Sequence, residues 1–186
     1  RAIAALPTRR ALRVLEVGAG TGSLTKAVLP SLPREQTEYV FTDVGPAFLA
    51  AAKTQFAEYS GVDYKLLDLE KDPVAQGYTP GSFDLILATD ALHATCDLRQ
   101  TLTHLRTCLA PGGLLMFLEV LTSRHAWNSI FGLLKGWWRY TDTTLRTNSP
   151  LLDRNTWHSL LADCGYENVS SFGGYINDDE SEQAVF

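Results

Sequence analysis

The sequence predicts an α/β fold in which a mostly parallel sheet of seven strands is covered by helices on both faces. Short apolar runs typical of strands alternate with segments whose apolar residues have helical spacing. The run 83–88 is mostly apolar and is bounded by Pro80-Gly81 and Asp90, which is typical of a buried parallel strand. A glycine cluster separates the first strand from the first helix. Strands that alternate with helices imply right-handed crossovers, and therefore parallel strands.

The first half of the chain contains three predicted strands and two predicted helices. Prolines at positions 30 and 33 mark the end of the first helix, because proline cannot continue a helix interior. The second strand is β-branched and aromatic and ends at Asp43, and the second helix is rich in alanine. We place the strands over 12–17, 39–42 and 62–67, and the helices over 23–32 and 48–59.

The second half adds a strand over 83–88 and a helix over 98–109, which carries four leucines on one face. Pro111-Gly-Gly113 turns the chain into the most apolar strand, over 114–118. After Val120 all four tryptophans of the chain occur. A helix over 157–164 follows. Two strands, over 169–172 and 183–186, are separated by an acidic turn at 178–180 and complete the seven-stranded prediction. We find no internal repeat and no linker, so we expect one domain over 1–186.

Composition sets the class of protein. The chain has 186 residues, of which 45% are apolar and 20% charged, and these values are typical of a globular domain with a continuous core. A net charge of −5 argues against a nucleic-acid partner. No apolar run approaches the ~20 residues of a membrane helix, and no signal peptide opens the chain. Three cysteines without metal-ligand spacing favour a cytoplasmic location.

The chain begins with Arg1, and its only methionine is Met116. A translated protein normally begins with methionine. We therefore expect this chain to be a piece of a longer polypeptide.

The segment Gly18-Ala-Gly-Thr-Gly22 lies between a predicted strand and a predicted helix. Glycines allow a sharp backbone turn and a close approach of a ligand, and the following helix N-terminus offers free N–H groups. A dinucleotide fingerprint would place its third small residue one position later, at Ser23. The spacing therefore favours S-adenosylmethionine over NAD. The alternative is a tight turn without a ligand.

Acidic residues lie at the carboxyl ends of three successive predicted strands, where open α/β sheets bind ligands. The carboxylate of Glu16 suits the ammonium or sulfonium of S-adenosylmethionine. Asp43 is placed to accept hydrogen bonds from a ribose diol, and Asp68 from an adenine amino group. Each alone could be a cap or a surface acid. The predicted cofactor-binding set comprises Glu16, Gly18, Ala19, Gly20, Gly22, Asp43, Val44, Asp68, Leu69 and Thr89.

Several further segments make the chain resemble the C-methyltransferase domain of polyketide synthases. They include Leu92-His-Ala-Thr95, Leu118-Glu119 and Phe131-Gly-Leu-Leu-Lys-Gly-Trp-Trp138. The glycine loop is shared by many methyltransferases, but these three segments together are far more specific, and the resemblance runs from about 14 to 165. It implies a Rossmann-like class I methyltransferase fold within a multidomain synthase.

The resemblance also implies the reaction. Such domains transfer a methyl group from S-adenosylmethionine to the α-carbon of a β-ketoacyl thioester, which is carried on the phosphopantetheine arm of an acyl carrier protein. Their catalytic pair falls on His93 and Glu119. Histidine is suited to remove the α-proton near neutral pH, and a carboxylate on its other ring nitrogen fixes the tautomer and stabilises the imidazolium. The chemistry requires no metal ion.

Three features remain open at this point. Asp90, where much of the family has asparagine, either raises the pKa of His93 or caps the helix that follows. Trp137 and Trp138 are either core residues or a wall of the acyl tunnel. His104, His125 and His158 receive no role, and Cys96 is interpreted as a small residue at a helix start.

Other functions fit parts of the pattern. A histidine–glutamate pair could also deprotonate an oxygen, so O- or N-methylation is an alternative. A non-catalytic structural remnant of a synthase is another, although the retained glycines, His93 and Glu119 favour an active domain. A nicotinamide-dependent oxidoreductase is disfavoured by Ser23.

Overall fold

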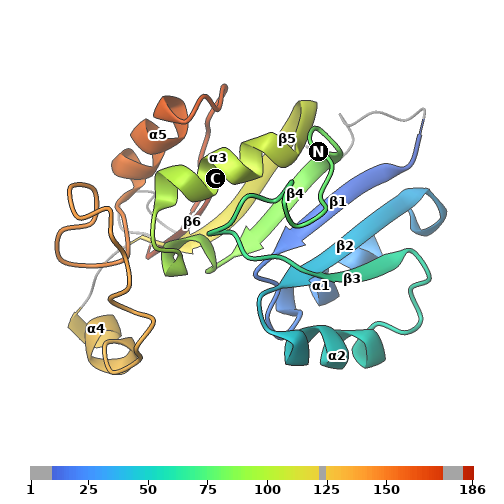
Figure 1. Ribbon diagram of the computed structural model, residues 1–186, viewed down its shortest axis with the longest axis horizontal. Coiled ribbons are helices and arrows are strands. Elements are labelled where there is room, and N and C mark those ends of the chain that lie inside the picture. Colours follow the sequence, from blue (N-terminus) through green and yellow to red (C-terminus); the bar gives the residue numbers. More distant parts are fainter. Residues whose placement is uncertain (1–9, 122–124, 174–181) are drawn as a thin grey trace.

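The structure is a computed structural model that describes residues 10–121, 125–173 and 182–186. A six-stranded sheet with the order β3-β2-β1-β4-β5-β6 forms its centre (Figure 1). The first five strands pair in parallel, and β6 pairs with β5 in the antiparallel direction. The bounds are β1 Leu12–Val17, β2 Thr37–Asp43, β3 Val62–Leu66, β4 Phe83–Thr89, β5 Leu109–Val120 and β6 Gln183–Val185. The α/β class and the mostly parallel sheet are confirmed.

The seventh strand of the prediction is wrong. Of the predicted strand over 169–172, only Phe172 pairs, through an isolated antiparallel bridge to Val185 in β6. Phe172 N–H donates to the Val185 carbonyl at 2.8 Å, and Val185 N–H donates back at 2.7 Å. This reciprocal pair of hydrogen bonds extends the edge of the sheet by a single residue pair, and a paired segment of that length is not a strand. The acidic turn predicted at 178–180 lies outside the described residues.

The helices follow the predicted order: the first three are shorter than predicted, the helix predicted over 157–164 begins earlier, at Arg154, and one helix is added. The first predicted helix is split, because Pro30 lies in a 3₁₀ turn, Leu29–Ser31, that ends α1. The addition is α4, which lies in the tryptophan-rich segment after β5. The bounds are α1 Ser23–Val28, α2 Pro46–Gln55, α3 Leu98–Cys108, α4 His125–Phe131 and α5 Arg154–Asp163, with short 3₁₀ helices at Arg34–Gln36 and Leu92–Ala94.

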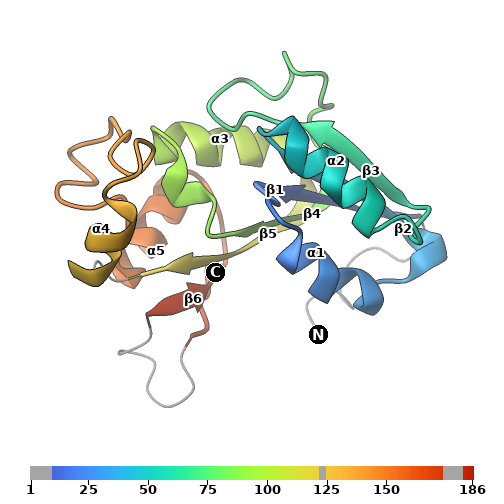
Figure 2. The same cartoon turned by 90° about the horizontal axis from the view of Figure 1, so that it is seen from below.

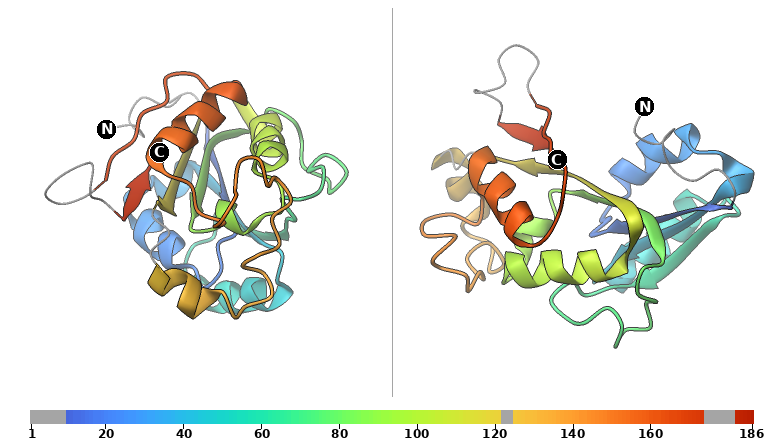
Figure 3. Two further views of the ribbon diagram at one scale, coloured as in Figure 1. Left: turned by 90° about the vertical axis from the view of Figure 1, so that its left-hand side faces the viewer. Right: turned by 90° about the horizontal axis from the view of Figure 1, so that it is seen from above.

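Two hydrophobic clusters cover the two faces of the sheet. On one face, Leu49 and Ala52 of α2 and Phe56 just after it pack with Leu29 against side chains of β1, β2 and β4. On the other, leucines of α3 pack with Trp157 and Leu160 of α5. Figure 1 shows α3 in front of the sheet with α5 to its left, and Figure 3 (right) shows α1 and α3 on opposite sides of the sheet. The sequence pattern of apolar residues on the strands therefore builds a three-layer fold.

This arrangement places the carboxyl ends of five parallel strands at one edge of the sheet. The strands point toward α4 and the segment that follows it (Figures 1 and 2). The ends of β4 and β5 are neighbours, with Thr89 paired to Leu118. Residues that follow β4 are thereby brought beside residues that end β5. No helix in the described ranges reaches the length and apolarity that crossing a bilayer requires.

Candidate active site

A cavity of about 830 Å³ opens at the carboxyl ends of the strands. One side is formed by loops that follow β1, β2, β3 and β4, and the other by α4 and the segment after it. Ligands of open α/β sheets bind at this edge. Six of the predicted site residues line the cavity, namely Gly18, Asp43, Val44, Asp68, Leu69 and His93. The other predicted residues are not among those that line it, namely Glu16, Ala19, Gly20, Gly22, Thr89 and Glu119.

The predicted catalytic pair is in contact. His93 lies in the 3₁₀ helix after β4, and its Nδ1 lies 2.6 Å from Glu119 Oε2 at the end of β5. Glu119 is fully buried, and its second oxygen, Oε1, accepts hydrogen bonds from the N–H groups of Leu92 at 2.8 Å and His93 at 3.3 Å. The carboxylate is therefore fixed from three directions. With Nδ1 engaged by Glu119, Nε2 is the ring nitrogen left to act as a base.

The surroundings of His93 favour its protonated form. Burial by itself would lower the pKa of His93, but the charge of Glu119 and its hydrogen bond outweigh this effect and raise the pKa above the ordinary value. Asp90 adds to the increase, and Arg146 opposes it. The imidazole is thereby a stronger base than a free histidine, and its cation is stabilised once a proton has been taken up.

The glycine loop is held against Asp43. Asp43 is buried, and its carboxylate accepts hydrogen bonds from Gly20 N–H at 2.9 Å and from Gly45 N–H at 2.8 Å. Ala19 N–H donates to the carbonyl of Thr42 at 2.9 Å. Sequence reasoning gave Asp43 a ligand role only, but the structure shows that it also ties the loop after β1 to the end of β2. Asp43 also lines the cavity.

Gly18 and Gly22 require glycine for steric reasons. Both have left-handed backbone angles, with φ of 59° at Gly18 and 77° at Gly22. A Cβ on Gly18 would lie 2.6 Å from the Cβ of Ala91, and one on Gly22 would lie 2.7 Å from the Phe56 ring. The first contact joins the glycine loop to the loop that carries His93.

Asp68 belongs to a turn that is held by hydrogen bonds to neighbouring side chains. Gln76 accepts a hydrogen bond from Asp68 N–H at 2.8 Å and donates to the Asp68 carbonyl at 2.9 Å. His104 of α3 lies 2.8 Å from the carbonyl of Leu69. Burial would raise the pKa of Asp68, but hydrogen bonds from Lys71 and the Glu70 N–H outweigh it and lower the pKa. Gln76 and His104 therefore position this part of the cavity, a role that sequence reasoning missed.

Glu16 does not line the cavity. Its carboxylate is buried and accepts hydrogen bonds from the hydroxyls of Thr25 and Tyr39, at 2.5 and 2.6 Å. Burial raises the pKa of Glu16, against these hydrogen bonds. Its side chain lies on the α1 face of the sheet, and its predicted contact with a cofactor stays a prediction. The same holds for Ala19, Gly20, Gly22 and Thr89, which are adjacent to the cavity but do not line it.

The two neighbouring tryptophans have different surroundings. Trp137 lines the cavity, stacks on Phe131 with ring centroids 5.4 Å apart, and meets the His93 ring edge-on at 5.9 Å. Its indole N–H donates to Asn128 Oδ1 at 3.0 Å. Trp138 is 48% exposed and lies outside the cavity. Of the two interpretations, a cavity wall describes Trp137, and neither describes Trp138.

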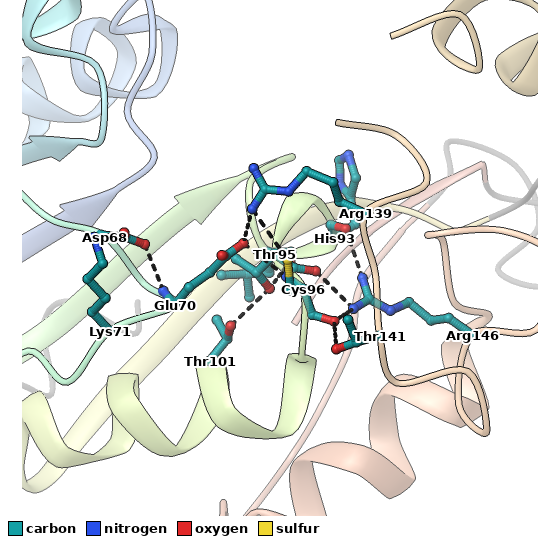
Figure 4. Close-up of polar contacts among 11 residues, drawn as sticks. Asp68, Glu70, Lys71, His93, Thr95, Cys96, Thr101, Arg139, Thr141 and Arg146 are labelled. Carbon is teal, nitrogen blue, oxygen red and sulfur yellow. Dashed lines mark hydrogen bonds and ion pairs between the residues drawn. The ribbon is translucent and has the colours of Figure 1, made fainter. Parts of the chain in front are cut away.

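Two arginines hold the loop after His93, and sequence reasoning identified neither. Figure 4 shows Arg146 pointing to the backbone of this loop, with hydrogen bonds to the carbonyls of His93 at 2.9 Å and of Thr95 and Cys96 at 2.8 Å each. Arg146 is buried and paired with Asp142. Arg139, which is exposed at the cavity, binds Glu70 at 2.6 Å and contacts Cys96 Sγ at 3.3 Å. No local sequence motif predicts these long-range contacts of Arg146 and Arg139.

The chain is similar to known methyltransferase domains. A family model described as a methyltransferase domain matches residues 15–115. The highly reducing polyketide synthase FUM1 of Gibberella moniliformis is 40% identical over 168 residues, which cover 88% of this chain and 6% of that protein. This chain is thus similar to a small part of a very long polypeptide.

Three solved structures share the fold and more than a quarter of the sequence. The CurJ carbon methyltransferase has a TM-score of 0.93 and 44% identity, covering 99% of this chain and 50% of that one. The CMeT domain of the citrinin polyketide synthase has a TM-score of 0.87 and 33% identity, covering 98% and 48%. The trans-methyltransferase CalH, solved with SAH, has a TM-score of 0.79 and 38% identity, covering 84% and 45%. The chain therefore spans about half the length of these structures.

The sheet, the glycine loop and the cavity at the strand ends define a class I methyltransferase fold. The chain belongs to the methyltransferase domain family, since that model matches more than half of its residues. Its resemblance to the C-methyltransferase domains of polyketide synthases is confirmed by the CurJ and citrinin synthase structures.

Proposed function

We propose that this domain transfers a methyl group from S-adenosylmethionine to the α-carbon of a β-ketoacyl thioester. The observation that carries the proposal is the 2.6 Å contact between His93 Nδ1 and the buried Glu119, because it presents an oriented base on the wall of the cavity that Gly18, Asp43 and Asp68 also line. The base and the predicted cofactor residues therefore face one space.

The residues fit the proposed cofactor. Gly18 offers bare backbone to a ligand, Asp43 and Asp68 offer carboxylate acceptors for hydroxyl or amino groups, and Val44 and Leu69 offer apolar surface. The CalH structure, whose chain is 38% identical, contains SAH. When bound, S-adenosylmethionine supplies an electrophilic methyl carbon that a carbon nucleophile attacks, while the C–S electron pair stays on sulfur. No metal ion is invoked, and that expectation stays a prediction.

His93 and Glu119 supply the other half of the chemistry. Nε2 of His93 accepts the α-proton, and the C–H electron pair becomes the enolate that is the nucleophile. Glu119 keeps the ring in one tautomer and stabilises the imidazolium, as a carboxylate does in the serine-hydrolase triad. Trp137 and Phe131 cover this side of the cavity and limit water near the enolate.

The domain works, in this proposal, as part of a longer synthase. Residues 1–186 form one methyltransferase domain, its neighbours are other synthase domains of the same polypeptide, and its acceptor is delivered by an acyl carrier protein. The similarity to a short part of FUM1 and to a domain of the citrinin synthase supports this arrangement.

The test is a methyl-labelling assay on the parent synthase module with a β-ketoacyl group loaded on its carrier. With S-adenosylmethionine labelled in the methyl group, mass spectrometry of the released acyl chain locates the label. Label on the α-carbon supports the proposal, and label on oxygen or nitrogen contradicts it. Calorimetric titration with S-adenosylhomocysteine distinguishes a non-catalytic remnant, which would not bind.

Variants separate the base from the cofactor residues. We expect His93→Ala to reduce methyl transfer roughly 10²–10⁴-fold, the usual range for loss of a general base, with little change in S-adenosylhomocysteine affinity. Asp43→Ala should weaken that affinity instead, because it removes an acceptor and releases Gly20 N–H. His158→Gln, outside the cavity, is the matched histidine control. If His93→Ala and Asp43→Ala both lost only cofactor binding, the assigned roles would be wrong.

A further inference from the structure

Asp90 has an unusual backbone conformation at the end of β4. Its φ is 47°, in the left-handed region that aspartate and asparagine tolerate better than most residues. Asp90 N–H donates to the Leu118 carbonyl at 2.9 Å, and its Oδ1 accepts from Val120 N–H at 3.2 Å. The residue thus bridges the ends of β4 and β5, between which His93 and Glu119 face each other.

The structure distinguishes the two interpretations of Asp90 that the sequence left open. The 3₁₀ helix that contains His93 begins after Ala91, and no side chain caps it. The Asp90 carboxylate instead lines the cavity, and it lies with the side-chain polar atoms of His93 and Glu119 within 4.8 Å of one another. Asp90 is therefore close enough to interact electrostatically with the base, and it does not act as a helix cap.

Among the described residues, three charged groups act on the His93 ring. Glu119 lies behind it on β5, and Asp90 lies beside it at the end of β4. Arg146, from the segment after α4, donates to the His93 carbonyl, but its own charge is paired with Asp142. Trp137, which packs edge-on against the ring, carries no charge. Two carboxylates against one already paired guanidinium leave an excess of negative charge around the imidazole.

The two carboxylates differ in their exposure to solvent. Glu119 is fully buried and hydrogen bonded to the ring, whereas Asp90 is exposed at the cavity. Burial of part of its carboxylate and the charge of Glu119 raise the pKa of Asp90, against His93 and the Val120 N–H, which lower it. Salt screens an exposed charge more strongly than a buried one. The contribution of Asp90 to the charge around His93 should therefore depend on ionic strength more than that of Glu119.

We propose that Asp90 is a positioning residue for the proposed methyl transfer, in which its carboxylate is a second negative charge that sets the pH range over which His93 acts as a base. This inference rests on the proposed function only for its catalytic consequence. The electrostatic coupling between Asp90 and His93 is a property of the folded chain and can be measured without substrate.

The test is an NMR titration of the histidine rings in the wild-type domain and in Asp90→Asn. Asparagine keeps the acceptor for Val120 N–H and tolerates the left-handed backbone, so the substitution removes mainly the charge. We expect the titration midpoint of His93 to fall by about 0.5–1 pH unit, the range for one nearby but partly exposed charge. The His93 signal is assigned by its loss in His93→Gln. A midpoint that moves by less than about 0.2 unit overturns the proposal.

Two further measurements exclude a general charge or folding effect. Asp63→Asn removes the same charge from β3, which two strands separate from β4, and should leave the His93 midpoint unchanged. In the wild type, added salt should lower the His93 midpoint, and in Asp90→Asn it should have a smaller effect. Equal salt responses in the two proteins would overturn the proposal even if the variant were less stable.

The catalytic consequence is read from pH–rate profiles of the synthase module. The acid limb for methyl transfer should move to lower pH in Asp90→Asn by the same amount as the NMR midpoint, because His93 then loses its proton at lower pH. An NMR shift in a module that transfers no methyl group would support the coupling while contradicting the proposed function. An unmoved acid limb in an active module overturns the proposed role of Asp90.

Discussion

At the scale of single residues, Gly18 and Ala91 set how closely two loops of the site approach each other. Gly18 follows β1, Ala91 follows β4, and a Cβ at position 18 would lie 2.6 Å from that of Ala91. The glycine loop and the His93 loop therefore pack without intervening side chains. A change at either position moves one loop relative to the other.

We predict that Gly18→Ala is clearly more destabilising than Gly20→Ala. Both positions have left-handed backbones, with φ of 59° and 54°, so both variants incur the penalty of roughly 1–2 kcal/mol for a Cβ in that region. Only position 18 adds a steric overlap, since a Cβ at position 20 has no neighbour nearer than 3.9 Å. Denaturant unfolding of the two variants measures the difference, and equal stabilities would contradict the packing argument.

At this scale, sequence reasoning correctly placed His93 beside Glu119, but it did not determine which face of the sheet the Glu16 side chain occupies. The positions of His93 after β4 and Glu119 at the end of β5 determine their proximity, because adjacent parallel strands end at the same edge. Glu16 also ends a strand, but successive side chains of a strand point to opposite faces. Its carboxylate faces Thr25 and Tyr39, and the residue pattern alone could not decide between that face and the ligand side.

At the scale of elements, Arg146 connects the segment after α4 to the loop between β4 and α3. Its guanidinium reaches three backbone carbonyls of this loop, and Thr141 N–H donates to one of them, that of Cys96, at 2.8 Å. Asp142 accepts from Leu98 N–H at 3.0 Å, at the start of α3. The loop that holds His93 is therefore fixed by a segment about fifty positions away in sequence, for which the sequence pattern gives no signal.

We predict that Arg146→Lys lowers the free energy of unfolding by about 2–4 kcal/mol. Lysine keeps the charge but lacks the planar set of donors, so buried carbonyls lose their partners. Hydrogen exchange of the amides over 92–98 should accelerate in this variant. Arg139→Lys is the matched control, because that arginine forms an exposed ion pair with Glu70, and it should change stability by less than about 1 kcal/mol. Similar losses in the two variants would show that Arg146 has no special role.

The predicted seventh strand shows the limit of local pattern at this scale. The residues over 169–172 have a strand-like composition, but a strand exists only where a partner runs beside it. β6 is three residues long and pairs with β5 along its length. It offers Phe172 a single bridge on its other side. Whether a partner strand is available depends on the tertiary structure. Local composition therefore predicted the five parallel strands correctly, but it failed for the strand over 169–172.

At the scale of the whole molecule, functionally different charged groups lie at the two ends of the strands of the sheet. The carboxyl ends of the strands carry the candidate active site, whereas the opposite end carries an ion pair that fixes the start of the described chain. Asp84, at the beginning of β4, is buried and accepts hydrogen bonds from the Arg10 guanidinium and from Arg13 N–H at 2.9 Å. The segment before β1 is thereby attached to the centre of the sheet.

We predict that Asp84→Asn lowers the melting temperature by about 3–6 °C at neutral pH, and that the difference shrinks in acid. Burial alone would raise the pKa of Asp84, but the hydrogen bonds from Arg10 and Arg13 outweigh it and lower the pKa. A carboxyl whose pKa is lower in the folded state contributes stability above its unfolded pKa, near ~3.9, and loses it as the pH falls further. Thermal unfolding at pH 7 and pH 3 measures this, and an undiminished difference at pH 3 would contradict it.

The wall formed by residues 127–139 contributes no side chain to either of the two hydrophobic clusters that hold the described sheet and helices together. Selection can therefore alter this wall while the scaffold beneath it stays intact, as happens with the variable loops of an antibody. Grafting the corresponding stretch from a related domain should therefore leave the sheet folded while it replaces the Trp137 contact with the His93 ring and the Arg139 contacts with Glu70 and Cys96.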